Sequence, residues 1–205
     1  MSRRSSVMTL AVLGLLHESP MHGYELRKRL NSMLGSFRAF SYGTLYPCLK
    51  ELLANGWIAE SSTATADAAL PHPLSGKRGR IVYQLTAEGK EHFQALLGEV
   101  GPTAWEDEQF DVRFAFFGRT DAETRLRILE GRRSRLQERL DGVRQSMART
   151  WERLDSYTLE LQRHGLESVE REVRWLDTLI EDERLGRSDG SASTRGRPSA
   201  GHDDN

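Results

Sequence analysis

The segment from Ser41 to Ile58, SYGTLYPCLKELLANGWI, constrains the fold more than any other stretch of the chain. Its leucines recur at helical spacing and predict a face that is buried in a core, at Leu45, Leu49, Leu52 and Leu53. The other face offers hydroxyls, aromatic rings and one cation, on Tyr42, Thr44, Tyr46 and Lys50. Asn55 and Gly56 end the predicted helix, and a strand follows. Such a helix can read a DNA groove, although periodicity alone indicates only an amphipathic helix.

Two further helices are predicted before this segment. Residues Val7 to Leu16 are apolar nearly all round, which predicts a buried helix that is too short to span a bilayer. A second helix is predicted from His22 to Leu34, with leucines inward and a basic run outward, and Gly35 ends it. Three helices with a short turn between the second and the third make a helix-turn-helix arrangement.

Two strand candidates follow, at Trp57 to Glu60 and at Ile81 to Leu85. The loop between them ends in SGKRGR, which carries Lys77, Arg78 and Arg80. Two strands with a basic tip form a wing that can lie along a phosphate backbone, and an ordinary solvated hairpin is an equal alternative. Thr86 then caps a further helix, whose apolar side is Phe93, Leu96 and Leu97.

Three motifs together resemble the PadR family of bacterial transcriptional regulators. They are HGYEL (residues 22–26), GTLYPCLKELLANGWI (43–58) and GRIVYQLTAEGKEHF (79–93), in the order and at about the spacing of that family. The resemblance is specific over roughly residues 7 to 97. It implies a mainly α fold with a small β-wing, in which a winged helix-turn-helix domain precedes a long antiparallel helical domain that dimerises. It also implies repression of transcription, relieved in many members by a small molecule.

This chain departs from the family pattern at its wing, where the loop contains the extra-long stretch ATADAALPHPLSG. The transfer of wing contacts from the family is therefore the weakest part of the resemblance. Pro47 lies inside the predicted third helix and removes one backbone donor there. Because the family has a proline at this place too, we expect the helix to tolerate it with a bent first turn.

The charge of the chain is divided unevenly along its length. The net charge is −1, which by itself does not favour nucleic acid as a partner. Residues 1–97 hold 11 Lys and Arg against 7 Asp and Glu, a balance of +4, and the remaining 18 and 23 give −5. A basic N-terminal half fits DNA binding that is confined to one domain. A single cysteine excludes an internal disulfide, and a secretory leader is not evident, so we expect a cytoplasmic protein.

The second half of the chain repeats apolar residues in a 3-4 spacing. The pattern predicts a long helix from Asp121 to Arg163, a break at His164 and Gly165, and a second helix that ends near Leu185. A second copy of the chain would cover this hairpin, so we expect a homodimer, with packing on its own N-terminal domain as the alternative. The predicted interface residues are Leu136, Leu140, Val143, Met147, Leu154, Leu161, Val169, Val173, Leu176 and Ile180.

The DNA-contacting residues are predicted from the helix-turn-helix and the wing. A two-fold dimer presents two reading helices and suits a palindromic operator in double-stranded DNA. The start of the third helix is expected at bases or nearby phosphates, the start of the second at phosphates, and the wing at the backbone or minor groove. The predicted residues are Tyr24, Arg27, Arg38, Ser41, Tyr42, Thr44, Tyr46, Lys50, Lys77, Arg78 and Arg80. For Tyr46, inward packing is an equal alternative.

Residues 102 to 117 join the two halves and are crowded with aromatic side chains. Core packing is the favoured interpretation, and the sharper alternative is the wall of a pocket for a small aromatic or hydrophobic effector. Trp105, Phe110 and Phe114 are the candidates for that wall.

Catalysis and metal binding are not expected. The six histidines are scattered, HExxH and a cysteine pair are missing, and there is no GxGxxG or Walker loop. We therefore predict no catalytic residue, no metal and no cofactor. The predicted organisation is a winged domain at 1–97, a linker with a connecting helix at 98–120, a helical dimerisation domain at 121–185 and a disordered tail at 186–205. A winged module that binds protein instead of specific DNA is the alternative function.

Overall fold

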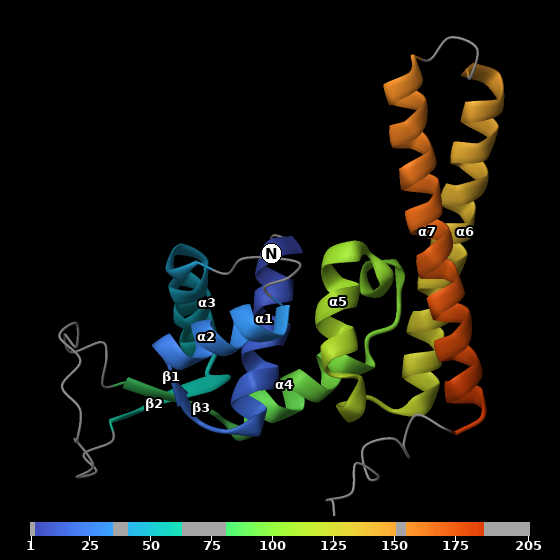
Figure 1. Cartoon of the computed structure of the whole chain (residues 1–205). Helices are drawn as coiled ribbons and strands as arrows, with labels where there is room; N and C mark the ends of the chain where they lie inside the picture. The colour runs from blue at the N-terminus through green and yellow to red at the C-terminus, as the bar shows by residue number, and fades with distance from the viewer. Residues whose placement is uncertain (1–2, 35–40, 63–80, 151–154, 187–205) are drawn as a thin grey trace, which may run out of the picture. The chain divides into compact units, whose positions relative to one another are not determined.

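The computed structural model describes residues 3–34, 41–62, 81–150 and 155–186. The chain divides into two compact units, Met1–Asp121 and Ala122–Asn205. Both are mainly helical, and the first also contains a small sheet (Figure 1).

The first unit has the element order of a winged helix-turn-helix. Its elements are α1 (Arg3–Glu18), β1 (Met21–His22), α2 (Gly23–Leu34), α3 (Tyr42–Ala54), β2 (Ile58–Ser62), β3 (Ile81–Leu85), α4 (Ala87–Gly98), the 3₁₀ helix η2 (Pro102–Trp105), α5 (Asp107–Ala115) and the 3₁₀ helix η3 (Phe117–Arg119). The sheet is antiparallel in the order β1-β3-β2, and its outer end pairs Ser62 with Ile81. The expected tip of the wing lies outside the described residues.

Helix α1 forms the centre of the core of this unit. It is longer than the predicted segment, and its residues from Val7 to Leu16 are all buried, as its all-round apolar sequence predicts. Gly14 permits the aromatic ring of Phe116 to approach the helix closely, because a Cβ atom at Gly14 would lie 2.2 Å from that ring. The leucines of α2 and α3 pack against the same core, at Leu26, Leu30, Leu34, Leu45, Leu49 and Leu52.

Helix α3 starts and ends close to where the sequence predicts. Ser41 precedes it in an extended conformation, and Gly56 adopts a positive φ of 72° after it, which favours glycine. Pro47 lies inside the helix and cannot donate to the carbonyl of Gly43. Gly43 is exposed, so water can satisfy that carbonyl, and the proline is tolerated.

The strand predictions are partly wrong. β3 has the predicted bounds, whereas β2 starts one residue later than predicted and extends to Ser62, because it pairs with β3 along its whole length. The two-residue strand β1 lies where the start of the second helix was expected. A strand of two residues has no periodicity that a sequence could reveal.

The second unit is a pair of helices, α6 (Ala122–Thr150) and α7 (Ser156–Arg184). The predicted break at His164 and Gly165 is wrong, because both residues lie inside α7. Asp155 instead starts α7, and its Oδ1 accepts hydrogen bonds from the backbone N–H groups of Tyr157 and Thr158 at 2.9 and 3.0 Å. A helix interior tolerates one glycine at a cost of about 1 kcal/mol, which capping and packing offset here.

Complementary charge joins α6 to α7. Arg125 forms a two-pronged ion pair with Glu183, with both N–O distances at 2.9 Å. Further pairs link Arg132 with Glu172 at 2.7 Å and Arg144 with Glu170 at 2.6 Å. These pairs fix the antiparallel register of the two helices.

The expected dimer-interface residues fall into three groups in this hairpin. Leu136, Leu140, Val173, Leu176 and Ile180 are already buried within one chain. Val143, Met147 and Val169 are half-buried, and Leu161 is 71% exposed. Leu154 lies outside the described residues. Thus the inner part of the predicted interface is the core of the hairpin itself.

Candidate nucleic-acid interface

Helix α3 presents a polar face beside its buried apolar face. Leu45, Cys48, Leu49 and Leu52 point into the core. The exposed residues at its start and along its outer side are Ser41, Tyr42, Gly43, Thr44 and Lys50. The helix therefore offers two hydroxyls, an aromatic ring and a cation to any partner that approaches this face.

The first turn of α3 is not capped by the side chain of Ser41. The backbone carbonyl of Ser41 accepts the N–H of Leu45 at 3.1 Å and the hydroxyl of Thr44 at 2.9 Å. The side chain of Ser41 makes no capping bond to the backbone and lies 3.4 Å from the Thr44 hydroxyl. Because this side chain does not cap the helix, the first backbone N–H groups remain able to meet an anionic group such as a phosphate.

Aromatic residues connect α3 to α2 at this surface. The guanidinium carbon of Arg27 lies 4.0 Å from the centroid of the Tyr42 ring. Tyr42 in turn stacks on Tyr46, with centroids 5.8 Å apart and ring planes at 20°. Tyr46 is half-buried and packs against the core, which is the inward alternative for this residue. Tyr24, in the first turn of α2, is 60% exposed.

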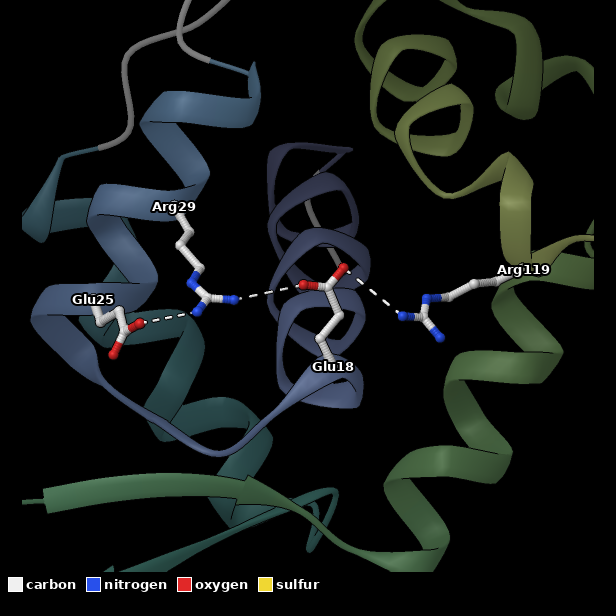
Figure 2. A network of polar contacts seen from close by, with 4 residues as sticks. All are labelled: Glu18, Glu25, Arg29 and Arg119. Atoms are coloured by element: carbon white, nitrogen blue, oxygen red, sulfur yellow. Dashed lines mark hydrogen bonds and ion pairs between the residues drawn. The ribbon is translucent and has the colours of Figure 1, made fainter. Parts of the chain in front are cut away.

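The basic residues of α2 differ in their surroundings. Figure 2 shows Glu18 at the end of α1 between the guanidinium groups of Arg29 and Arg119, at 3.6 and 3.8 Å. Arg29 also donates to Glu25 at 3.1 Å. These side chains are about 40% exposed, so each pair contributes at most about 1 kcal/mol. Two carboxylates nevertheless accompany Arg29, whereas Lys28 on the same helix is exposed.

Four of the predicted DNA-contacting residues lie outside the described part of the chain. They are Arg38, in the link before α3, and the wing residues Lys77, Arg78 and Arg80. The base of the wing is described, and the Nδ1 atom of His22 lies 3.1 Å from the backbone carbonyl of Ile81 there. This contact joins β1 to the strand that leaves the wing.

Cys48 is a packing residue of α3. Its Sγ atom lies 3.8 Å from the hydroxyl of Thr9, and burial raises the pKa of the thiol to about 11. The thiolate, which is the reactive form, is therefore scarce at neutral pH.

The aromatic stretch proposed as an effector wall is a packed cluster. Phe114 lies 5.8 Å from Phe110 and 5.0 Å from Phe117, measured between ring centroids. Phe110 is buried, and Trp105 is half-buried. The buried guanidinium of Arg113 donates to the carbonyl of Leu96 at 2.7 Å and so ties α5 to the end of α4. The non-local partners of Arg113 gave no signal in the sequence.

Metal binding and membrane insertion find no support in the described segments. Among the residues in these segments, His, Cys, Asp and Glu do not gather in threes or more around a possible metal position. No described helix combines the length and the apolar character that a membrane crossing requires.

Residues 12–95, from α1 to α4, match the sequence model of the Transcriptional regulator PadR-like family. This part of the chain is a PadR-like domain. A curated relative, the negative transcriptional regulator PadR of Bacillus subtilis (strain 168), is 29% identical over 91 residues, or 44% of this chain. The match spans about half, 45%, of the length of that relative.

Solved PadR structures are also similar to this chain. Bacillus subtilis PadR in complex with operator DNA is 19% identical, with 86% of this chain and 99% of that chain covered and a TM-score of 0.39. The same protein in complex with p-coumaric acid is 19% identical, with 87% and 99% covered and a TM-score of 0.39. A PadR-like regulator from Bacillus cereus is 19% identical, with 87% and 99% covered and a TM-score of 0.37. At these TM-scores we place no functional argument on the structural likeness.

Proposed function

We propose that the protein is a transcriptional regulator that binds duplex DNA through its PadR-like domain. The observation that carries the proposal is the coincidence of that domain with an exposed polar face on α2 and α3. A helix that buries its leucines and presents hydroxyls, aromatic rings and a cation has the side chains that groove and backbone contacts use. We assign residues 1–97 to this function and expect it to be exercised in the cytoplasm.

The contacts are divided by chemistry. Ser41, Tyr42 and Thr44 meet base edges or nearby phosphates, since they surround the start of α3. Tyr24 in α2 and Lys50 in α3 are exposed and meet the phosphate backbone. The remaining proposed contacts are Arg38, before α3, and the wing residues Lys77, Arg78 and Arg80, on the backbone or in the minor groove.

We further propose that the protein acts as a homodimer through its helical unit. Outward apolar side chains on α7 support this, because Tyr157 is 87% exposed, Leu161 71% and Trp175 42%. Large apolar side chains that gather on one exposed helix favour a protein partner. A two-fold dimer would place two α3 helices on a palindromic operator. In keeping with the name of the Bacillus subtilis relative, we propose repression of a nearby promoter or its own.

A small aromatic or hydrophobic effector that releases the protein from DNA is part of the proposal. The proposal follows the relative that matches by sequence, Bacillus subtilis PadR, a protein that has been solved in complex with p-coumaric acid. Trp105 and the stacked rings of Phe110 and Phe114 are the residues that we propose to contact it.

The test starts with duplexes that the full-length protein selects from a random library. Affinity is then measured against salt for Lys50→Gln and for a matched control, Lys90→Gln, which removes an exposed cation from α4. We expect Lys50→Gln to weaken binding to all duplexes and to reduce the salt slope by about one, because one phosphate contact is lost. Lys90→Gln should bind as the parent protein does. Equal effects of the two variants would contradict the assignment of α3. Failure to enrich any sequence would favour a module that binds protein.

A further inference from the structure

We propose that Arg27 is a positioning residue, which holds the Tyr42 ring and fixes the reading end of α3 against α2 and does not contact a phosphate. The inference rests on the proposed function, since it concerns how the DNA-facing surface is held. The charge of Arg27 and its place in α2 predict a phosphate contact, and the inference replaces that role with a positioning role.

The cation and the two rings form one continuous stack. The guanidinium carbon of Arg27 lies 4.0 Å from the centroid of Tyr42, a distance at which a cation is attracted to the face of the ring. Tyr42 stacks on Tyr46 with nearly parallel planes. The exposed ring of Tyr42 thus contacts both the Arg27 guanidinium and the Tyr46 ring, and these contacts set its orientation before any partner arrives.

The stack is anchored at both of its ends. Arg27 lies one helical turn after Gly23 in α2, and Tyr46 lies one turn after Tyr42 in α3, so each pair shares a face of its helix. Gly23 is buried, and a Cβ atom placed there would lie 3.5 Å from the hydroxyl oxygen of Tyr46. The two helices therefore meet at two points along their lengths, and the stack resists rotation of α3 about α2.

The geometry of Arg27 disfavours a phosphate contact. Its Nε atom is buried and has no hydrogen-bond partner among the described residues. A guanidinium can grip a phosphate with two parallel N–H groups along either of two edges, and this burial closes the edge that includes Nε, which leaves only the edge of the two Nη atoms. Lys28 and Lys50, which are exposed, are better placed to supply charge to a backbone.

A double-mutant cycle on full-length protein and a selected duplex tests the role. Arg27→Lys keeps the charge but not the planar stack, and we expect a Kd that is weaker by about two- to five-fold with the salt slope unchanged. In a Tyr42→Leu background the same change should have no further effect, because Arg27 acts through that ring. Lys50→Gln, with a slope reduced by about one, serves as the phosphate-contact reference.

Two results would overturn the proposal. One is wild-type affinity for Arg27→Lys together with a slope reduced by about one for Arg27→Gln, which would mean a phosphate contact. The other is a double variant whose fold-change in Kd equals the product of the two single fold-changes, which would mean that Arg27 and Tyr42 act independently. Nuclear magnetic resonance of the free protein provides a readout that needs no DNA: Arg27→Lys should shift the ring protons of Tyr42 at unchanged thermal stability. If Arg27→Lys does not shift these protons, the stack is refuted. If it shifts them but the wild-type protein binds no duplex, only the proposed function is refuted.

Discussion

The ion pair between Arg125 and Glu183 should contribute strongly to the stability of the hairpin. Both side chains are only 8% exposed, and both prongs of the pair are 2.9 Å long. Arg125→Met keeps most of the apolar stem but leaves the Glu183 carboxylate buried without this cation. Removal of one partner from a buried pair typically costs about 3–5 kcal/mol, because the remaining charge is desolvated and uncompensated. We expect a loss of about 3 kcal/mol in the free energy of unfolding.

Urea denaturation, followed by circular dichroism of the full-length chain, measures this loss. The matched control is Arg127→Met on the same helix, since the pair of Arg127 with Glu123 is 60% and 73% exposed and should contribute less than about 0.5 kcal/mol. The double variant Arg125→Met with Glu183→Leu should recover most of the stability, because it leaves no orphaned charge. A loss for Arg125→Met that does not exceed that of the control would refute the reasoning.

Three further outcomes follow from local packing in the two units. Gly89→Ala should destabilise by about 1–3 kcal/mol in urea denaturation, because its Cβ would lie 1.9 Å from the carbonyl oxygen of Trp57, whereas Gly142→Ala, with open space around it, should stabilise. Burial lowers the pKa of the His92 imidazole, so the folding stability that depends on its neutral form is present above pH 6.5 and is lost as the pH falls from there. The fluorescence of Trp57, whose ring stacks on this imidazole with centroids 3.6 Å apart, should change in the same pH window, and His92→Gln should remove the change. Cys48 should react with iodoacetamide at pH 8 only on unfolding, and rapid labelling of the native protein would contradict its high pKa.

Local signals in the sequence predicted the elements of the first unit well. The leucine spacing of α3 and the cap at Thr86 are short-range features, and Thr86 does accept the N–H of Gly89 at 3.0 Å. The bounds of β3 also match, because its run of β-branched and aromatic residues ends at that cap. Strand β1 was missed because its existence depends on pairing with a strand about 60 residues away.

The turn of the hairpin was misplaced for a physical reason. Gly165 is a strong local signal for a helix end, but its cost is small beside the ion pairs and the buried apolar residues Val173, Leu176 and Ile180 of α7. Asp155 caps α7 at its true start, and the 3-4 apolar spacing runs across this position without a visible break, so the spacing hides the cap. Sequence spacing cannot decide between two such positions when the deciding contacts join residues 40 to 58 positions apart.

The chemistry of the proposed DNA-facing surface was only partly accessible to sequence reasoning. The exposed positions of Tyr42, Thr44 and Lys50 follow from helical periodicity. The stacking of Arg27 on Tyr42 depends on how α2 and α3 cross, which periodicity does not specify. Arg27, which the sequence predicts as a phosphate ligand, lies over the Tyr42 ring in the structure, and its positioning role is our proposal.

Binding of the purified full-length protein to DNA from upstream of its own gene tests the central claim most directly. It should be measured at two salt concentrations with an unrelated duplex as competitor. The account predicts binding that resists the competitor and weakens steeply with salt, because specific contacts add to released counterions. Lack of binding at low salt, both to this DNA and to duplexes drawn from a random library, would contradict it.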